Sequence, residues 1–175
     1  MESSSSLTLA TFSDIGLELA WPEAVAVTLE VADRVSRAGG ALVTPDARHV
    51  VLDAEGSVSI VPGSPIPAHP VRQAATLLRD LLDDASAPAE LRDFVAQNTR
   101  ERPACAWIEE FTTALHYFER PRRQEILADV ARRAISAQES LVAADAAAET
   151  REDAGGSADA PRGLWSTLAR LFGRS

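Results

Sequence analysis

The sequence contains no lysine. All 17 of its basic residues are arginines, they stand against 26 acidic residues, and the net charge is −9. The absence of lysine excludes Schiff-base chemistry, a lysine general base and the lysine of a phosphate-binding loop. The acidic balance opposes binding to a phosphate backbone, because no local basic face is present to overcome the overall field. We therefore expect no nucleic-acid partner.

Cysteine and long apolar runs are also scarce. Cys105 is the one cysteine, which excludes an intrachain disulfide and is typical of a reducing compartment. No run of about 18 uninterrupted apolar residues occurs, and the beginning, MESSSSLTLA, lacks a basic region followed by an apolar run. These features predict a cytoplasmic protein without a transmembrane helix.

Apolar residues make up 46% of the chain, enough for one packed domain with tails. After an N-terminal segment, 1–20, we expect a helical domain over 21–142, because apolar residues recur there at helical spacing. Helices are predicted from Pro22 to the glycines at 39 and 40, from Pro70 to 82, from Pro88, around 108–118, and from Pro121 to 141. The predicted core positions are Val25, Leu29, Ala32, Val35, Val71, Ala74, Ala75, Leu78, Leu81, Leu82, Leu91, Phe94, Val95, Ile108, Phe111, Leu115, Phe118, Leu127, Val130, Ala131 and Ala134.

Two segments in this domain are not helical. HVVLDAEGSVSIV places Asp53 and Gly56 at the corners of a type I turn, and Val58 and Ile60 alternate with serines, which predicts one small β-hairpin. PGSPIPAHP carries too many prolines for a helix or a sheet, so we expect an extended crossing. The fold class is therefore mainly α with one hairpin.

The end of the chain is predicted to be a tether followed by a docking helix. Residues 143–163 are small and polar with nothing large to bury, which favours a flexible linker. Residues 164–175 are predicted to form an amphipathic helix whose exposed aromatic and aliphatic side chains would bind a partner. The predicted partner-binding residues are Leu164, Trp165, Leu168, Leu171, Phe172, Arg170 and Arg174.

Three uses of this helix stay open. It can enter a groove of another protein, or lie on an anionic membrane surface with its arginines towards the lipid headgroups, or fold back on its own domain. The second use would make the protein peripheral to a membrane. Because the helix is short, its membrane affinity alone would be weak.

The order of helix, hairpin, proline-rich crossing and helices resembles the C-terminal lobe of a bacterial serine/threonine protein kinase, from about Trp21 to Ala134. PEAVAVTLEVADRVSRAGG is similar to the helix before the catalytic loop, and HVVLDAEGSVSIV to the hairpin that carries magnesium ligands. VRQAATLLRDLLDD is similar to the helix after the activation segment. LRDFVAQNTRERPACAWIEEFTTAL is similar to the closing helices, with the Arg-Pro dipeptide at Arg102 and Pro103.

The residues that perform the chemistry of this family are absent from the matching positions. Leu42, Val43 and Thr44 stand at the His-Arg-Asp positions, Asp46 at the lysine, His49 at the asparagine, and Pro62, Gly63 and Ser64 at Asp-Phe-Gly. Ala-Pro-Glu is missing too, so Arg102 needs another acid or faces water. Segment 1–20 is too short for the family's N-terminal lobe with its glycine-rich loop and lysine. Phosphoryl transfer depends on positioned metal ions and cations, so the resemblance implies a non-catalytic, pseudokinase-like domain.

Other site chemistries find little support. His49, His69, His116 and Cys105 lack close ligand spacing, so no metal is expected. Cys105 near a helix N-terminus could be reactive, but a partly buried structural cysteine is the simpler interpretation. The arginines around 120–133 lie among Glu119, Glu125 and Asp129, which favours a salt-bridged helix over a phosphate-binding patch.

Together these features predict a non-enzymatic adaptor or scaffold that needs no cofactor and binds another protein through its C-terminal helix. Two alternatives remain: an accessory protein tethered to a membrane surface, and a residual nucleotide-binding or phosphotransferase protein.

Overall fold

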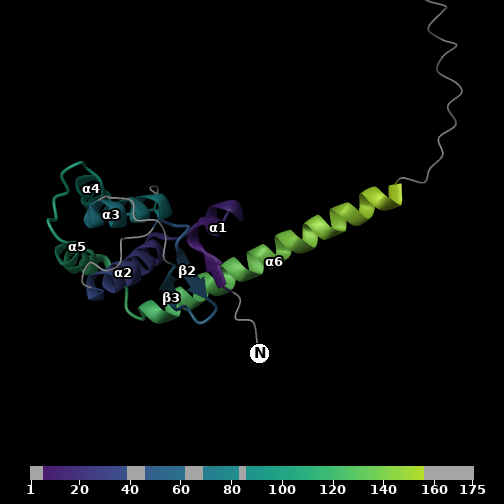
Figure 1. Ribbon diagram of the computed structural model, residues 1–175, viewed down its shortest axis with the longest axis horizontal. Coiled ribbons are helices and arrows are strands. Elements are labelled where there is room, and N and C mark those ends of the chain that lie inside the picture. The colour runs from purple at the N-terminus through teal and green to yellow at the C-terminus, as the bar shows by residue number, and fades with distance from the viewer. Residues whose placement is uncertain (1–5, 39–45, 62–68, 83–85, 156–175) are drawn as a thin grey trace, which may run out of the picture. The chain divides into compact units, whose positions relative to one another are not determined.

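The computed structural model describes residues 6–38, 46–61, 69–82 and 86–155, with side chains as far as residue 144. It is mainly helical with a small antiparallel sheet (Figure 1). The chain forms two units, Met1–Glu139 and Ser140–Ser175, and the packing below is that of the first. The elements are β1 (Ser6–Thr8), α1 (Leu9–Asp14), α2 (Trp21–Arg37), β2 (Val50–Asp53), β3 (Val58–Ile60), α3 (Pro70–Leu81), α4 (Ala89–Asn98), α5 (Ile108–Leu115), the 3₁₀ turn η1 (His116–Phe118) and α6 (Arg123–Gly155).

Helix α2 is the centre of the first unit. Its first turn contains Pro22, and the Glu23 carboxylate accepts a hydrogen bond from the Ala20 N–H at 2.9 Å, which satisfies one donor ahead of the helix. Every residue from Ala24 to Leu29 is buried. One side of α2 packs into a core cluster with α1, the sheet and α6, and the other side packs into a cluster with α3, α4 and α5.

The sheet covers the first of these clusters. Strand β2 is central and pairs antiparallel with both β1 and β3, with Leu52 opposite Leu7 on one side and opposite Val58 on the other. Because side chains alternate along a strand, Val50 and Leu52 point to the same face, and both are buried. The hairpin predicted from the sequence is thus present as part of a three-stranded sheet.

The turn of the hairpin packs directly on α6. The Gly56 N–H donates to the Asp53 carbonyl at 3.0 Å, and Asp53 Oδ1 accepts from the N–H groups of Glu55 and Ser57. Gly56 has a φ of +82°, and a Cβ at this position would lie 2.9 Å from both Ala128 Cα and Leu127 C. Glycine is therefore required both by the backbone conformation and by the approach of α6.

Helices α3, α4 and α5 build the second cluster as their apolar spacing predicts. The residues predicted to be core on α3, Val71, Ala74, Ala75 and Leu78, are fully buried, while Leu81 and Leu82 are half-buried. On α5, Phe111 and Leu115 are fully buried. Asn98 closes α4, because its side chain donates to the Phe94 carbonyl and accepts from the Cys105 N–H at 2.9 Å each.

Arg123 ties the beginning of α6 to α2 and η1. Its guanidinium contacts Glu119 Oε1 and Asp33 Oδ2, each at 2.6 Å, and Glu30 at 3.4 Å. The hydrogen bond from Arg123 lowers the pKa of Glu119. Arg122 pairs with Glu125, and Arg132 pairs with Asp129. The salt-bridged interpretation of this arginine-rich segment is confirmed.

Three boundaries differ from the predictions. Segment 1–20, for which no element was predicted, contains β1 and α1. The strand was not predicted because three residues are too few to show alternation in the sequence. The sheet therefore has three strands, where one hairpin was predicted. Helix α6 begins at Arg123 and continues to Gly155, through part of the predicted linker 143–163. Alanine has the highest helix propensity, so this alanine-rich stretch is helical without large apolar side chains.

Replacing Gly56 with alanine tests the packing of the hairpin on α6. We expect G56A to lower the free energy of unfolding by about 3 kcal/mol, from a strained left-handed backbone and overpacking against α6. G16A is the matched control, because Gly16 has a φ of +65° but nothing within 4 Å of an added Cβ. It should cost only about 1 kcal/mol. Urea unfolding followed by circular dichroism measures both, and equal losses would contradict the contact.

Candidate functional site

The structure describes only some of the residues that the sequence analysis predicted to be functional. The docking residues 164–175 lie outside it, as do Leu42, Val43 and Thr44 and the positions 62–64. Asp46 and His49, which the sequence resemblance aligned with the lysine and asparagine of a kinase catalytic loop, are described.

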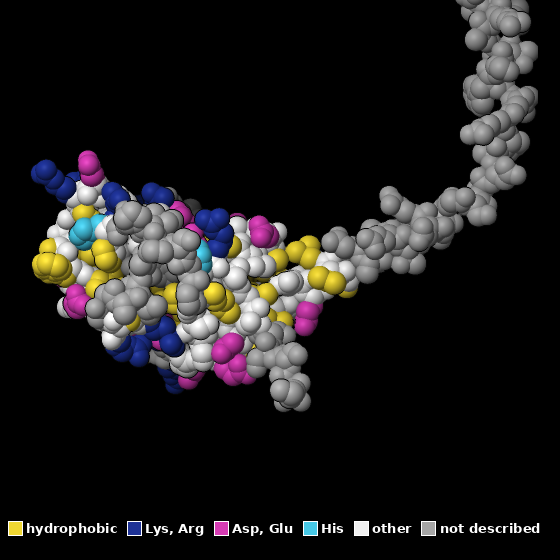
Figure 2. Space-filling model, in the orientation of Figure 1, with side chains coloured by type: hydrophobic (Ala, Val, Ile, Leu, Met, Phe, Trp, Pro, Cys, Tyr) yellow, Lys and Arg dark blue, Asp and Glu magenta, His cyan; other side chains and the backbone are white. Residues whose placement is uncertain are grey.

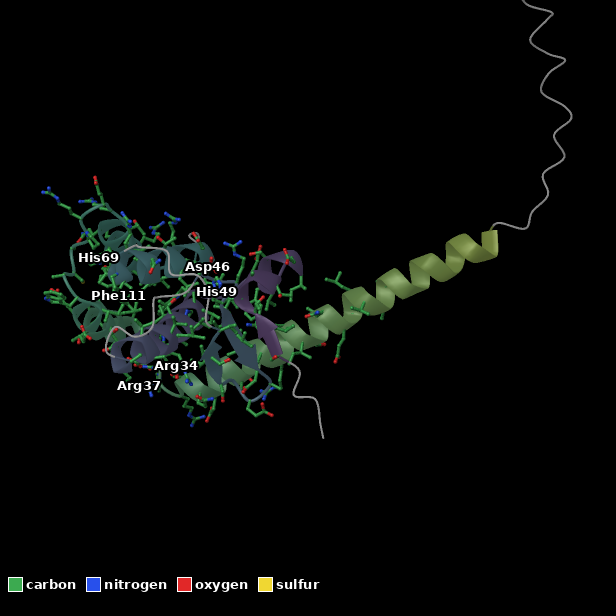
Figure 3. The ribbon with its side chains drawn as sticks, viewed as in Figure 1. Arg34, Arg37, Asp46, His49, His69 and Phe111 are labelled. Carbon is green, nitrogen blue, oxygen red and sulfur yellow. The ribbon has the colours of Figure 1, made fainter. Side chains whose placement is uncertain are left out.

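Asp46 and His49 form a carboxylate–imidazole pair at the start of β2. Asp46 Oδ1 accepts hydrogen bonds from His49 Nδ1 at 2.8 Å and from the Arg48 N–H at 2.9 Å, and Asp46 Oδ2 accepts from the Arg48 side chain at 3.0 Å. The backbone is fixed as well, since the His49 N–H donates to the Asp46 carbonyl. Figure 3 shows the two side chains next to each other at this end of the sheet.

The pair is tied to its neighbours on both sides. The Val61 N–H donates to the His49 carbonyl at 2.8 Å, and the Ala10 N–H of α1 donates to the Ala47 carbonyl at 3.1 Å. Partial burial raises the pKa of Asp46, but the hydrogen bonds from Arg48 and His49 outweigh it, and the net shift is downward. Asp46 is therefore an anion at neutral pH.

This arrangement orients an imidazole without a nucleophile beside it. A carboxylate on Nδ1 fixes the ring and leaves Nε2 as the free nitrogen, which is the arrangement found in general bases and in metal ligands. Within the described chain no hydroxyl or thiol is hydrogen-bonded to His49. No group of three or more potential metal ligands occurs among these residues either.

A shallow pocket of about 390 Å³ lies between the end of α2 and β3, lined by Arg34, Arg37, Ala38, Ser59 and Ile60. Its two arginines share a single acid, Glu30. Arg34 Nε lies 3.2 Å from Glu30 Oε1, and Arg37 Nη2 lies 3.8 Å from the same oxygen. In Figure 3 these arginines stand apart from Asp46 and His49. The pocket therefore keeps part of the positive charge of its arginines, apart from the Asp46–His49 pair.

The histidines and Cys105 do not form a common site. His116 Nδ1 lies 2.6 Å from Glu119 on η1, and His69 lies apart from His49 in Figure 3. Cys105 is buried rather than half-exposed. Burial and the charge of Glu110 raise the pKa of its thiol despite a hydrogen bond from Asn98. Arg102, the arginine of the Arg-Pro dipeptide, is exposed.

Among the described residues, the largest exposed aromatic side chains lie at the two ends of α5, and they were not singled out from the sequence. Trp107 is 72% exposed and Tyr117 is 86% exposed. The available signal was their position outside the apolar stripe formed by Ile108, Phe111, Leu115 and Phe118. Figure 2 shows hydrophobic side chains on the surface at the end of the molecule where α4 and α5 lie.

Comparison of the chain with protein-family models, with curated proteins and with solved structures finds no match.

Replacing Asp46 with asparagine tests the electrostatic role of the pair. Because the pKa of Asp46 is lower in the folded state, its charge stabilises the fold above the unfolded pKa near 3.8, and this contribution is lost as the pH falls through the folded value. D46N should therefore reduce the unfolding free energy at pH 7, by less than about 1 kcal/mol at so exposed a site. Urea unfolding at pH 7 and at pH 3.5 should show the deficit shrinking in acid. A deficit that grows in acid would contradict the assignment.

Alkylation tests the state of Cys105. A buried thiol with a raised pKa is a poor nucleophile, so the native protein should react with iodoacetamide at pH 8 at least about tenfold more slowly than glutathione does. The urea-unfolded protein provides the control and should react at the glutathione rate. A native rate equal to that of glutathione would restore the reactive-cysteine interpretation.

Proposed function

We propose that the protein is a non-catalytic adaptor or scaffold, in which a pseudokinase-like helical domain, 21–142, carries a protein-docking helix, 164–175. Two features support the first part. The described elements follow the order that the kinase resemblance implies, with helix α2 followed by the β2–β3 hairpin and then by helices α3 to α6. The catalytic-loop positions that are described hold residues unsuited to phosphoryl transfer.

The Asp46–His49 pair carries this proposal. A kinase needs a cation near the transferred phosphate and an amide oxygen for magnesium at these two positions. Here an anionic carboxylate occupies the lysine position, and its oxygens are already bonded to Arg48 and His49. A negative charge there would repel the nucleotide phosphates. The arginines of the pocket beside β3 share Glu30 and stand apart from this pair in Figure 3, so they do not cancel its charge.

The proposed docking function rests on the sequence of residues 164–175. Its apolar anchors, Leu164, Trp165, Leu168, Leu171 and Phe172, share one side of a helical wheel, which suits insertion in a groove of another protein. Attachment to a membrane surface is the competing use of the same residues. Within the described residues, no helix has the length and apolar character that crossing a bilayer requires.

Affinity capture tests the docking helix. The intact chain should retain a specific partner from a lysate of its own source, identified by mass spectrometry, and the triple variant W165A/L168A/F172A should lose it. The double variant S166A/T167A is the matched control, because it changes the polar side of the same segment. Capture of the same proteins by all three versions would refute docking through this helix.

Nucleotide titration tests the absence of kinase chemistry. A ligand at about 100 times its dissociation constant stabilises the folded state by about 2.7 kcal/mol, which would raise the melting temperature by several degrees. We expect less than about one degree for ATP with or without magnesium. A clear rise would favour the residual nucleotide-binding function.

Liposome flotation tests the membrane alternative. The intact chain and a chain ending at Gly163 should behave alike on vesicles that contain anionic lipid, because a single short helix gives little membrane affinity. Flotation of the intact chain alone would replace protein docking with membrane attachment.

A further inference from the structure

We propose that the outward face of α5, formed by Trp107, Glu110 and Tyr117, is a second docking surface, and that it binds an arginine-bearing segment of a partner protein. We name this set of residues the α5 face. It does not depend on the C-terminal helix, because it lies within the first unit and uses none of residues 164–175.

The burial pattern of α5 separates a core side from an outward side. Phe111, Thr112 and Leu115 are buried, whereas Glu110 is exposed. Trp107 is the residue just before α5 and Tyr117 lies in η1 just after it, and both are exposed, as Glu110 is. Counted at helical spacing, Tyr117 follows Glu110 by about two turns and Trp107 precedes it by about one turn, which places the three positions towards one side of α5. At about 1.5 Å per residue the backbones of Trp107 and Tyr117 are roughly 15 Å apart.

The Tyr117 ring is held in place, and Trp107 is fixed through its backbone. The Tyr117 ring makes an edge-to-face contact with Phe118 at 5.4 Å between centroids, and Phe118 lies 6.2 Å from Phe94, which stacks on Phe111 at 5.2 Å. This ladder connects the exposed phenol to the buried core. The Trp107 carbonyl accepts from the Phe111 N–H at 3.1 Å, which fixes its backbone. Rings that are ordered before binding lose little conformational entropy on binding.

The charge of the face indicates a cationic partner. The sequence of α5, IEEFTTAL, contains two acids and no basic residue. Glu110 Oε2 accepts from the Ala106 N–H at 2.8 Å, and Glu109 Oε1 accepts from the Ser36 hydroxyl at 2.9 Å, so both carboxylates are positioned. A guanidinium can stack on an aromatic ring and pair with a carboxylate at the same time, which a carboxylate or an aliphatic side chain cannot do.

The chain uses the same chemistry internally. The Arg120 guanidinium lies 5.3 Å over the ring of Trp21. Trp107 and Tyr117 make no such contact with an arginine among the described residues. The α5 face therefore presents two exposed rings on either side of an acid, with the cation missing.

A defined peptide tests the proposal on the intact protein. In an extended peptide, arginines about five positions apart span the distance between the rings. We expect a glycine–serine peptide with two such arginines to bind about tenfold or more tightly than the same peptide with glutamines in their place. The readout is the indole N–H signal of Trp107 in NMR titrations. The indoles of Trp21 and Trp165 serve as internal references, and the W107F variant supplies the assignment.

The variant W107A/Y117A should weaken binding of the arginine peptide about tenfold, and E110Q should weaken it severalfold with a shallower salt dependence. The matched control is L141A/V142A, which removes exposed apolar side chains from α6, outside the α5 face, and should leave binding unchanged. Thermal melting verifies that each variant is folded.

Several results would overturn the proposal. One is that the protein binds the arginine and glutamine peptides with equal affinity, and another is that it binds neither peptide at millimolar concentration. A third is that the W107A/Y117A variant binds the arginine peptide as tightly as the unaltered protein does. Sedimentation could also contradict it. If the intact protein forms a homodimer that the W107A/Y117A substitutions dissociate, the α5 face binds a second copy of the chain instead. None of these measurements alters residues 164–175, so failure here is distinguishable from failure of the C-terminal docking helix.

Discussion

Burial of α2 on opposite sides is the constraint on which the first unit depends. Six consecutive residues, Ala24 to Leu29, are inaccessible to solvent, so this helix has no solvent-facing side over that length and must be covered by separate layers. Each fully buried valine or leucine contributes roughly 1.5–3 kcal/mol relative to exposure. The sheet and α6 bury one side of α2, and α3, α4 and α5 bury the other side. All sites described above are placed by these two covers.

The helical core was predictable because its spacing is unambiguous. Val71, Ala74, Ala75 and Leu78 follow the 3.6-residue period, and all are buried as expected. The Asp53–Gly56 turn was predictable from residue types with strong turn preferences. Strand β1 was not, because three residues carry no periodic signal. The continuation of α6 was missed because lack of large apolar residues was equated with lack of structure, while helix propensity favours alanine.

The candidate sites show a similar division. The proposed kinase resemblance drew attention to Asp46 and His49, but it did not predict that they bond to each other, since that depends on the local turn before β2. Trp107 and Tyr117 lie off the apolar stripe of α5, so their exposure follows from the sequence. The anchoring of the Tyr117 ring does not, because the ladder through Phe118, Phe94 and Phe111 joins α5 and η1 to α4 in three dimensions.

The hydrogen-bonded Asp46–His49 pair and the exposed aromatic side chains of the described residues are the features on which the proposed binding function rests. The α5 face and the proposed C-terminal helix differ in chemistry, one acidic and aromatic, the other apolar with arginines. Two such surfaces on one chain would allow different partners to be held at once, which is the property that defines a scaffold.

The close approach of Gly56 to Ala128 also dictates an order of folding. The three strands are complete by Ile60, and α2 precedes them, but part of the residues that cover them, Leu127, Val130 and Ala134, come from α6. The second cluster needs nothing beyond Phe118. During synthesis the helical half can therefore close around α2 while the apolar face of the sheet waits for a segment some seventy residues later. Contacts of such long sequence separation form slowly, so the nascent sheet is the region most exposed to misassociation before the chain is finished.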